Sequence, residues 1–140
     1  MTDFAKLLKE HELKATFQRM SILKALERVG HMDVDEIYAE VRQMHPTISL
    51  ATVYKNIVTM VERSVLVEVP IVGHKSKYEI RKHEHIHLIC QACGHVVDED
   101  IDDSLIRDTE TIAHKSAFAL ENRQVNLYGI CSACQQQKAS

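Results

Sequence analysis

Two cysteine pairs of identical spacing constrain this chain more than any other feature of its sequence. Cys90 and Cys93 form the first pair, and Cys131 and Cys134 form the second. Each C-x2-C loop can present two sulfurs to one point, so the pairs together supply the four thiolates of a tetrahedral Zn²⁺ site. Buried free cysteines would not be expected to repeat the spacing, and a redox switch is the remaining alternative. We therefore expect a structural zinc, with a folded unit enclosed between the two pairs.

The composition favours a zinc site over disulfides and divides the chain in two. The 140 residues contain no apolar run of membrane-spanning length and begin with no secretion signal, so we expect a cytoplasmic protein, in which disulfides are rare. Residues 1–80 hold eleven basic and eleven acidic side chains, whereas residues 81–140 hold six and nine. The second part therefore carries the whole net charge of -3, together with all four cysteines. This asymmetry predicts a neutral domain followed by an acidic, metal-binding one.

Residues 1–80 show the periodicity of successive helices followed by a hairpin. Apolar residues recur at helical spacing in four segments, of which the third begins near Asp33 and the fourth is capped by Ser49. A short turn at residues 46–48 joins these two segments, as in a helix-turn-helix. Two β-rich segments then flank Gly73. The pattern predicts a winged helix, with a purely helical packing unit as the alternative.

The outward face of the fourth helical segment is suited to DNA. Side chains that can reach phosphates or base edges are expected there, namely Thr52, Tyr54, Lys55 and Asn56. Arg19 on the second helix can neutralise phosphate charge. A domain without net positive charge binds DNA only modestly as a monomer, so we expect a dimer that doubles the phosphate contacts.

A histidine-rich segment follows the hairpin. His83, Glu84 and His87 formally match the H-E-x-x-H signature of zinc peptidases, which functions only on a helix. The flanking residues have the pattern of extended chain, so we expect a strand, and a peptidase is the weaker interpretation. On a strand His85 and His87 share one face as a chelating pair, while Glu84 faces away from them.

The histidine pair needs further ligands to hold a divalent metal. The candidates are Glu79 at the end of the hairpin, Asp98 beyond the first cysteine pair, and His31 in the helical part. Imidazole and carboxylate ligands suit Fe²⁺, Mn²⁺ or Zn²⁺. Alternatively, His31 caps the end of the second helix and Asp98 belongs to a solvated acidic run. Four-thiolate sites are closed and structural, whereas a mixed site of this kind can fill and empty with metal supply.

Several motifs together resemble the ferric uptake regulator (Fur) superfamily of bacterial metal- and peroxide-sensing repressors. They run from Leu13-Lys14-Ala15-Thr16-x-Gln18-Arg19 through Ile48-Ser49-Leu50-Ala51-Thr52-Val53-Tyr54 and His85-Ile86-His87-x2-Cys90-x2-Cys93-Gly94 to Leu127-Tyr128-Gly129-x-Cys131-x2-Cys134. The resemblance implies an α+β chain with a winged helix-turn-helix DNA-binding domain at residues 1–80 and a hinge at residues 81–84. A small α/β domain for dimerisation and metal sensing would follow at residues 85–140.

The resemblance also implies ligands and partners. The four cysteines would hold a structural Zn²⁺, and a regulatory Fe²⁺ or Mn²⁺, replaceable by Zn²⁺ in vitro, would bind elsewhere. The implied regulatory ligands are His31, Glu79, His85, His87 and Asp98. This metal would close a homodimer onto double-stranded operator DNA, with Arg19 and Tyr54 among the DNA contacts. No membrane and no small-molecule substrate other than metal and hydrogen peroxide is expected.

Five positions bear on whether the chain resembles the peroxide sensors or the iron sensors of this superfamily. Where iron sensors typically carry the ligands of an additional metal site, this chain has Glu84, Ile86 and Arg123. Asp98 also resembles the peroxide sensors, whereas Glu79 resembles the iron sensors. We therefore expect a repressor, not an enzyme, that hydrogen peroxide inactivates through iron-catalysed oxidation of His31 or His85. An iron- or zinc-responsive uptake regulator without peroxide sensing is the alternative.

Overall fold

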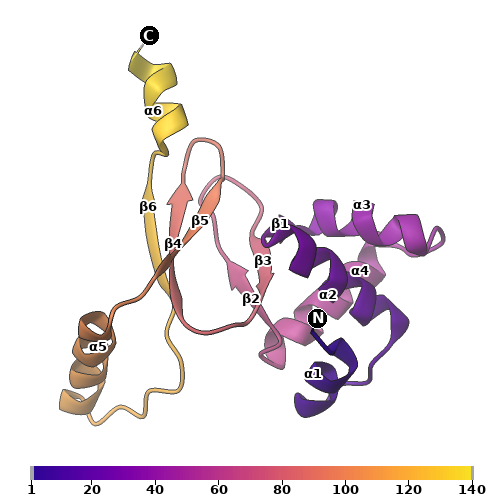
Figure 1. Cartoon of the computed structure of the whole chain (residues 1–140), viewed down its shortest axis with the longest axis horizontal. Coiled ribbons are helices and arrows are strands. Elements are labelled where there is room, and N and C mark those ends of the chain that lie inside the picture. The colour runs from indigo at the N-terminus through magenta and orange to yellow at the C-terminus, as the bar shows by residue number, and fades with distance from the viewer. Residues whose placement is uncertain (1, 140) are drawn as a thin grey trace. The chain divides into compact units, whose positions relative to one another are not determined.

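The computed structural model describes residues 2–139 and divides the chain into two compact units. The first unit is Met1–Arg81 and the second unit is Lys82–Ser140. Each unit has its own sheet and its own helices (Figure 1). Among the residues described, no helix is long and apolar enough to cross a membrane.

The first unit combines helices with a three-stranded antiparallel sheet. In chain order its elements are α1 (Phe4–Glu10), α2 (Phe17–Val29), β1 (Met32–Asp33), α3 (Val34–Met44), α4 (Leu50–Glu62), β2 (Leu66–Val69) and β3 (Lys77–Ile80). The strand order is β1-β3-β2. β2 ends at Val69 because Pro70 has no N–H to donate, and the chain then turns through Gly73 at a φ of 80°. Helices α3 and α4 followed by this hairpin form the predicted winged helix-turn-helix.

Side-chain caps set the starts of α3 and α4. The Glu36 N–H donates to the Asp33 carboxylate while the Asp33 N–H donates to the Glu36 carboxylate, so a reciprocal cap starts α3 at the predicted place. At α4, the Thr52 N–H donates to the Ser49 hydroxyl, again as predicted. These bonds satisfy backbone donors that have no partner within the helix and so fix where each helix begins.

Aliphatic side chains close the core of the first unit. Its largest fully buried side chains include Leu8, Ile22, Leu23, Leu26, Ile37 and Ile57. Helical spacing from Ile37 and Val41 predicts that Met44 lies on the buried face of α3, but Met44 is 53% exposed. It is the last residue of that helix and lies beyond the turns that Ile37 and Val41 anchor in the core. The core thus holds the helices and the sheet of this unit together without a contribution from Met44.

The second unit is built on another three-stranded sheet. Its elements are β4 (His85–Cys90), β5 (Val96–Asp100), α5 (Asp103–Lys115), β6 (Val125–Gly129) and α6 (Ser132–Ala139). β4 is the central strand, antiparallel to β5 and parallel to β6. The histidine segment therefore lies on a strand, as predicted. The peptidase interpretation fails, because its signature requires both histidines on one helix.

One face of this second sheet carries exposed apolar side chains. Leu88 on β4 pairs with Val97 on β5 and with Leu127 on β6, and all three are exposed. We call these three residues the apolar sheet face. Helices α5 and α6 lie at opposite ends of the sheet (Figure 1). Within the described part of the second unit, buried apolar residues are limited to Ile89, Cys90, Val96 and Ala113.

Candidate metal centres and nucleic-acid interface

The four cysteines gather at one end of the second sheet, and we call them the cysteine cluster. Cys90 ends β4 and Cys131 follows β6, and the parallel pairing of Cys90 with Gly129 brings the two C-x2-C loops together. All four sulfurs lie within 4.8 Å of one another. Cys93 Sγ and Cys131 Sγ are 3.9 Å apart. A tetrahedron with Zn–S bonds of about 2.3 Å has edges of about 3.8 Å, so the spacing fits zinc.

The electrostatics of the cysteine cluster also favour a cation. The backbone N–H groups of Cys131 and Cys93 donate to Cys90 Sγ at 3.3 and 3.5 Å and lower the pKa of that thiol to about 6. The hydrogen bond between Cys134 and Cys131 raises the pKa of the Cys134 thiol to about 12. One sulfur is therefore readily ionised while its neighbours oppose ionisation of the last. A divalent cation among the sulfurs removes that opposition.

A second ligand group, the histidine–aspartate cluster, lies on the same sheet. His85 and His87 share one face of β4, and Asp98 on β5 is directly opposite His87. The Nε2 atoms of His85 and His87 lie 3.3 and 3.9 Å from Asp98 Oδ1. The other carboxylate oxygen, Oδ2, accepts from Lys82 Nζ at 3.1 Å. The two rings and one carboxylate oxygen thus converge on one side of the sheet.

Both rings are held through Nδ1. His87 Nδ1 lies 2.9 Å from Asn126 Oδ1 on β6, and His85 Nδ1 lies 3.1 Å from the His83 carbonyl oxygen. Oxygen partners favour the Nδ1–H tautomer and leave Nε2 as the metal-binding atom. Sequence reasoning missed Asn126. Only the parallel register that places Asn126 opposite His87 reveals its role, and that register is not visible in the sequence.

In the first unit, His31 and Glu79 form a histidine–glutamate pair. β1 pairs with β3 in antiparallel register, with Met32 opposite Tyr78. His31 and Glu79 therefore lie beside each other. His31 Nε2 is 2.6 Å from Glu79 Oε2, and both side chains are largely buried. The C-cap of α2 is Gly30, so the alternative in which His31 caps that helix is wrong. The first unit thus contributes two of the five predicted regulatory ligands, and the second unit contributes the other three.

Arg123 and Glu84 form an ion pair at two of the positions where the resemblance to the Fur superfamily implies an additional metal site in iron sensors. Arg123 Nε donates to Glu84 at 2.8 Å, and Arg123 Nη1 donates to the Thr109 hydroxyl on α5 at 2.8 Å. The hydrogen bond to Glu84 raises the pKa of the guanidinium. A permanent cation held beside Glu84 disfavours the binding of a metal ion at the same place.

The residues predicted to contact DNA differ in how far they are already bonded within the first unit. Tyr54 is 51% exposed, and Lys55 is exposed beside it. Thr52 Oγ1 lies 2.9 Å from the Ser49 hydroxyl at the start of α4. Asn56 Oδ1 accepts a hydrogen bond from Arg19 Nε at 3.1 Å. The structure thus brings Arg19, which comes from α2, onto the surface of α4.

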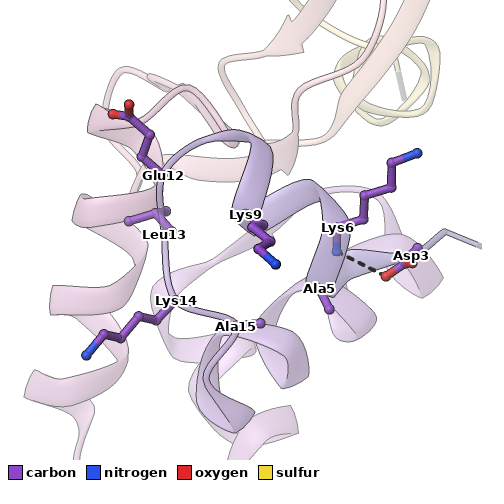
Figure 2. A pocket seen from close by; sticks show the side chains of 8 residues that line it. All are labelled: Asp3, Ala5, Lys6, Lys9, Glu12, Leu13, Lys14 and Ala15. Carbon is purple, nitrogen blue, oxygen red and sulfur yellow. Dashed lines mark hydrogen bonds between the residues drawn. The ribbon is translucent and has the colours of Figure 1, made fainter.

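A basic concavity lies beside the loop that precedes α2. Its volume is about 800 Å³, and Lys6, Lys9 and Lys14 line it together with Asp3 and Glu12 (Figure 2). Three ammonium groups against two carboxylates make this region locally basic in a unit whose charges otherwise balance. Such a local excess of positive charge suits phosphate groups.

Sequence comparison relates most of the chain to one protein family. Residues 10–128 match the model of the ferric uptake regulator family. The peroxide-responsive repressor PerR of Staphylococcus saprophyticus is 30% identical over 139 residues, covering 98% of this chain and 93% of that protein. The ferric uptake regulation protein of Campylobacter jejuni is 31% identical over 140 residues, covering 97% of this chain and 88% of that protein.

A solved structure extends the likeness to three dimensions. The crystal structure of the Campylobacter jejuni peroxide stress regulator has 38% sequence identity and a TM-score of 0.76, and it covers 95% of this chain and 100% of that one. The predicted α+β class is thereby confirmed, with a winged helix followed by a smaller mixed unit.

Proposed function

Because the chain belongs to the ferric uptake regulator family of metal-responsive transcriptional regulators, we propose that it is a repressor that binds operator DNA as a metal-loaded dimer. One observation carries this proposal. The chain holds two chemically different ligand sets, a cysteine cluster and a group of imidazoles facing carboxylates. A closed thiolate site suits a permanently bound ion, whereas a mixed imidazole and carboxylate site suits an ion that is bound and released.

The cysteine cluster would hold the structural Zn²⁺. The first C-x2-C segment follows β4 and the second follows β6 and runs into α6, so a zinc ion there would fasten α6 to the central strand. Binding of zinc by thiolates contributes directly to the free energy of folding, because the unfolded chain offers no preformed site. Zinc is thus proposed to be part of the fold of the second unit.

The regulatory Fe²⁺ or Mn²⁺ would take ligands from both units. The histidine–glutamate pair and the histidine–aspartate cluster supply three imidazoles and two carboxylates, a set that also accepts Zn²⁺ in vitro. An ion bound by all five would restrain the DNA-binding domain, residues 1–80, across a hinge at residues 81–84. Loss of the ion would release that restraint, and DNA affinity would fall because fewer molecules hold the binding geometry.

Dimerisation would use residues 85–140. The apolar sheet face leaves Leu88, Val97 and Leu127 exposed on adjacent strands, and contiguous apolar surface of this kind marks an interface. A second copy of the chain is the proposed cover. Two winged helices in one dimer would then bind the two halves of an operator, with α4 directed to the DNA.

Within this family we further propose that hydrogen peroxide is the signal. Bound iron would supply the electron-transfer chemistry that cleaves peroxide. One peroxide oxygen would be inserted at a ring C–H bond of His31 or His85 and the other would leave as water, and the oxidised ring would cease to be a ligand. The repressor would therefore be consumed and would not turn over. The Arg123–Glu84 ion pair supports this, because it replaces the additional site of iron sensors. The 31% identity to a ferric uptake regulation protein supports the second candidate, an iron- or zinc-responsive regulator without peroxide sensing.

Mass spectrometry of the anaerobically iron-loaded dimer after a peroxide pulse separates the two candidates. We expect one added oxygen on the peptide containing His31 or His85, together with loss of operator binding. The same protein loaded with Mn²⁺ is the control and should remain unmodified. Unmodified histidine peptides with undiminished operator affinity would favour the uptake regulator.

A further inference from the structure

Asn56 uses both ends of its side-chain amide within the first unit. Its Oδ1 accepts a hydrogen bond from Arg19 Nε at 3.1 Å, and its Nδ2 donates to the Thr52 carbonyl oxygen at 3.0 Å. Arg19 Nε can only donate and the carbonyl can only accept, so both bonds require the same orientation of the amide. Asn56 is therefore oriented by two partners, one on α2 and one on its own helix.

This orientation restricts how Asn56 can turn toward a base. An asparagine recognises adenine by presenting Oδ1 and Nδ2 together to the base edge. Here one of these atoms faces Arg19 and the other is bonded back to the α4 backbone. Each atom keeps one further lone pair or hydrogen, but turning the amide toward a base would break both bonds, and the Arg19 side chain would lose its contact with α4.

Arg19 is fixed on a second side by the loop before α2. Its Nη1 donates to the Lys14 carbonyl oxygen at 3.1 Å. Because a guanidinium is planar and rigid, hydrogen bonds from two of its nitrogens, Nε and Nη1, to partners on different sides fix the plane of the whole group. The Nη2 donors lie outside these two bonds. A side chain that is ordered before binding loses less conformational entropy when it contacts a phosphate.

We propose that Asn56 is a positioning residue that holds Arg19 as a phosphate-binding group of the DNA interface and that Asn56 itself reads no base. The inference rests on the proposed function, since it takes the α4 surface to face operator DNA. It divides the five predicted DNA contacts into two kinds. Arg19 and Asn56 act as one unit that sets affinity, which leaves sequence discrimination on α4 to other side chains such as exposed Tyr54 and Lys55.

A double-mutant cycle on the metal-loaded full-length dimer tests the proposal. The operator is first selected from a random duplex library with wild-type protein, and affinities are then measured by fluorescence anisotropy at several salt concentrations. Arg19→Ala should weaken binding about 10- to 100-fold per subunit, as expected for a charge-assisted hydrogen bond. It should also reduce the slope of log affinity against log salt by about 1 per subunit.

Asn56→Ala should weaken binding by a smaller factor that is the same for every base substitution in the operator. Because the two residues form one unit, the double variant should bind like Arg19→Ala to within about twofold. Lys55→Ala is the matched control, because this neighbouring side chain lies outside the network, and its effect should multiply with that of Arg19→Ala. Melting temperatures show that each variant is folded.

Several results would overturn the inference while leaving the proposed function intact. These are an Asn56→Ala variant that loses discrimination at one base pair, a double variant whose effects multiply, and an Arg19→Ala variant that binds like the wild type. A metal-loaded wild-type protein that selects no sequence overturns the proposed function itself, and the inference with it.

Discussion

The two units of this chain differ in what stabilises them. The first unit encloses a core of aliphatic side chains drawn from its helices and its sheet, and each fully buried side chain of this kind contributes roughly 1.5–3 kcal/mol. The described part of the second unit buries few apolar residues and exposes others on a sheet face. It also carries the cysteine cluster. The first unit is therefore expected to fold on its own core, whereas the second is expected to depend on zinc and on a second copy.

Removing one thiolate should produce the largest difference in stability between the two units. Cys93→Ser leaves three sulfurs, and we expect loss of the zinc and of the dimer, since thiolate-bound zinc contributes on the order of 10 kcal/mol to folding. Zinc content, sedimentation and hydrogen exchange would show an unfolded second unit beside a protected first unit. Gln136→Ala, on the exposed side of α6, is the control and should behave as the wild type. A zinc-free variant that stays dimeric would contradict the assignment.

A cavity in the core of the first unit should destabilise that unit and leave the second unit unchanged. Ile57→Ala removes a fully buried side chain of α4 and should lower the free energy of unfolding of the first unit by about 2–5 kcal/mol. Zinc content and dimerisation should be unchanged. Val72→Ala, at a 69% exposed position, is the matched control and should change stability by less than about 0.5 kcal/mol. Denaturant titration followed by hydrogen exchange would measure both. Loss of zinc in Ile57→Ala would contradict the expectation that the two units are stabilised independently.

Asn126 allows the regulatory metal site to be distinguished from the cysteine cluster within the second unit. Asn126→Ala removes the partner of His87 Nδ1 without removing a ligand, and such changes typically lower metal affinity about 10- to 100-fold. The cysteine cluster should keep its zinc. Competition with a metal-chelating dye, in parallel with zinc analysis, would give both affinities. Equal loss at the two sites would mean that Asn126 supports the fold and not the metal.

Much of the fold follows from local patterns in the sequence. The helical period of residues such as Val53, Ile57 and Met60, together with the Asp33 and Ser49 caps, predicts the helix-turn-helix because these signals act within a few residues. The paired C-x2-C spacing predicts the cysteine cluster for a chemical reason, because two such pairs supply the four thiolates of one tetrahedral zinc site. Met44 is the exception, since helical period alone does not reveal where a helix leaves the core.

Features that depend on the register between distant strands could not be predicted. β1 is only two residues long and carries no recognisable strand pattern, yet its pairing with β3 places His31 beside Glu79. The contact of Asn126 with His87 requires the parallel pairing of β6 with β4. Similarly, the bond between Arg19 and Asn56 depends on how α2 packs against α4. Sequence spacing predicts which residues can act as ligands, whereas long-range strand and helix pairing determines which side chains lie beside them.

The central claim is that a regulatory metal, separate from the structural zinc, controls DNA binding. The most direct test measures the operator affinity of zinc-containing protein with and without Fe²⁺ or Mn²⁺, under anaerobic conditions, for the wild type and for His87→Ala. His95→Ala, an exposed histidine near the cysteine cluster, is the control. We expect added metal to raise wild-type and His95→Ala affinity by about 5- to 150-fold, the usual range of an allosteric coupling. His87→Ala should stay dimeric, retain its zinc and show no response. A metal-independent affinity in the wild type, or loss of zinc from His87→Ala, would contradict the account.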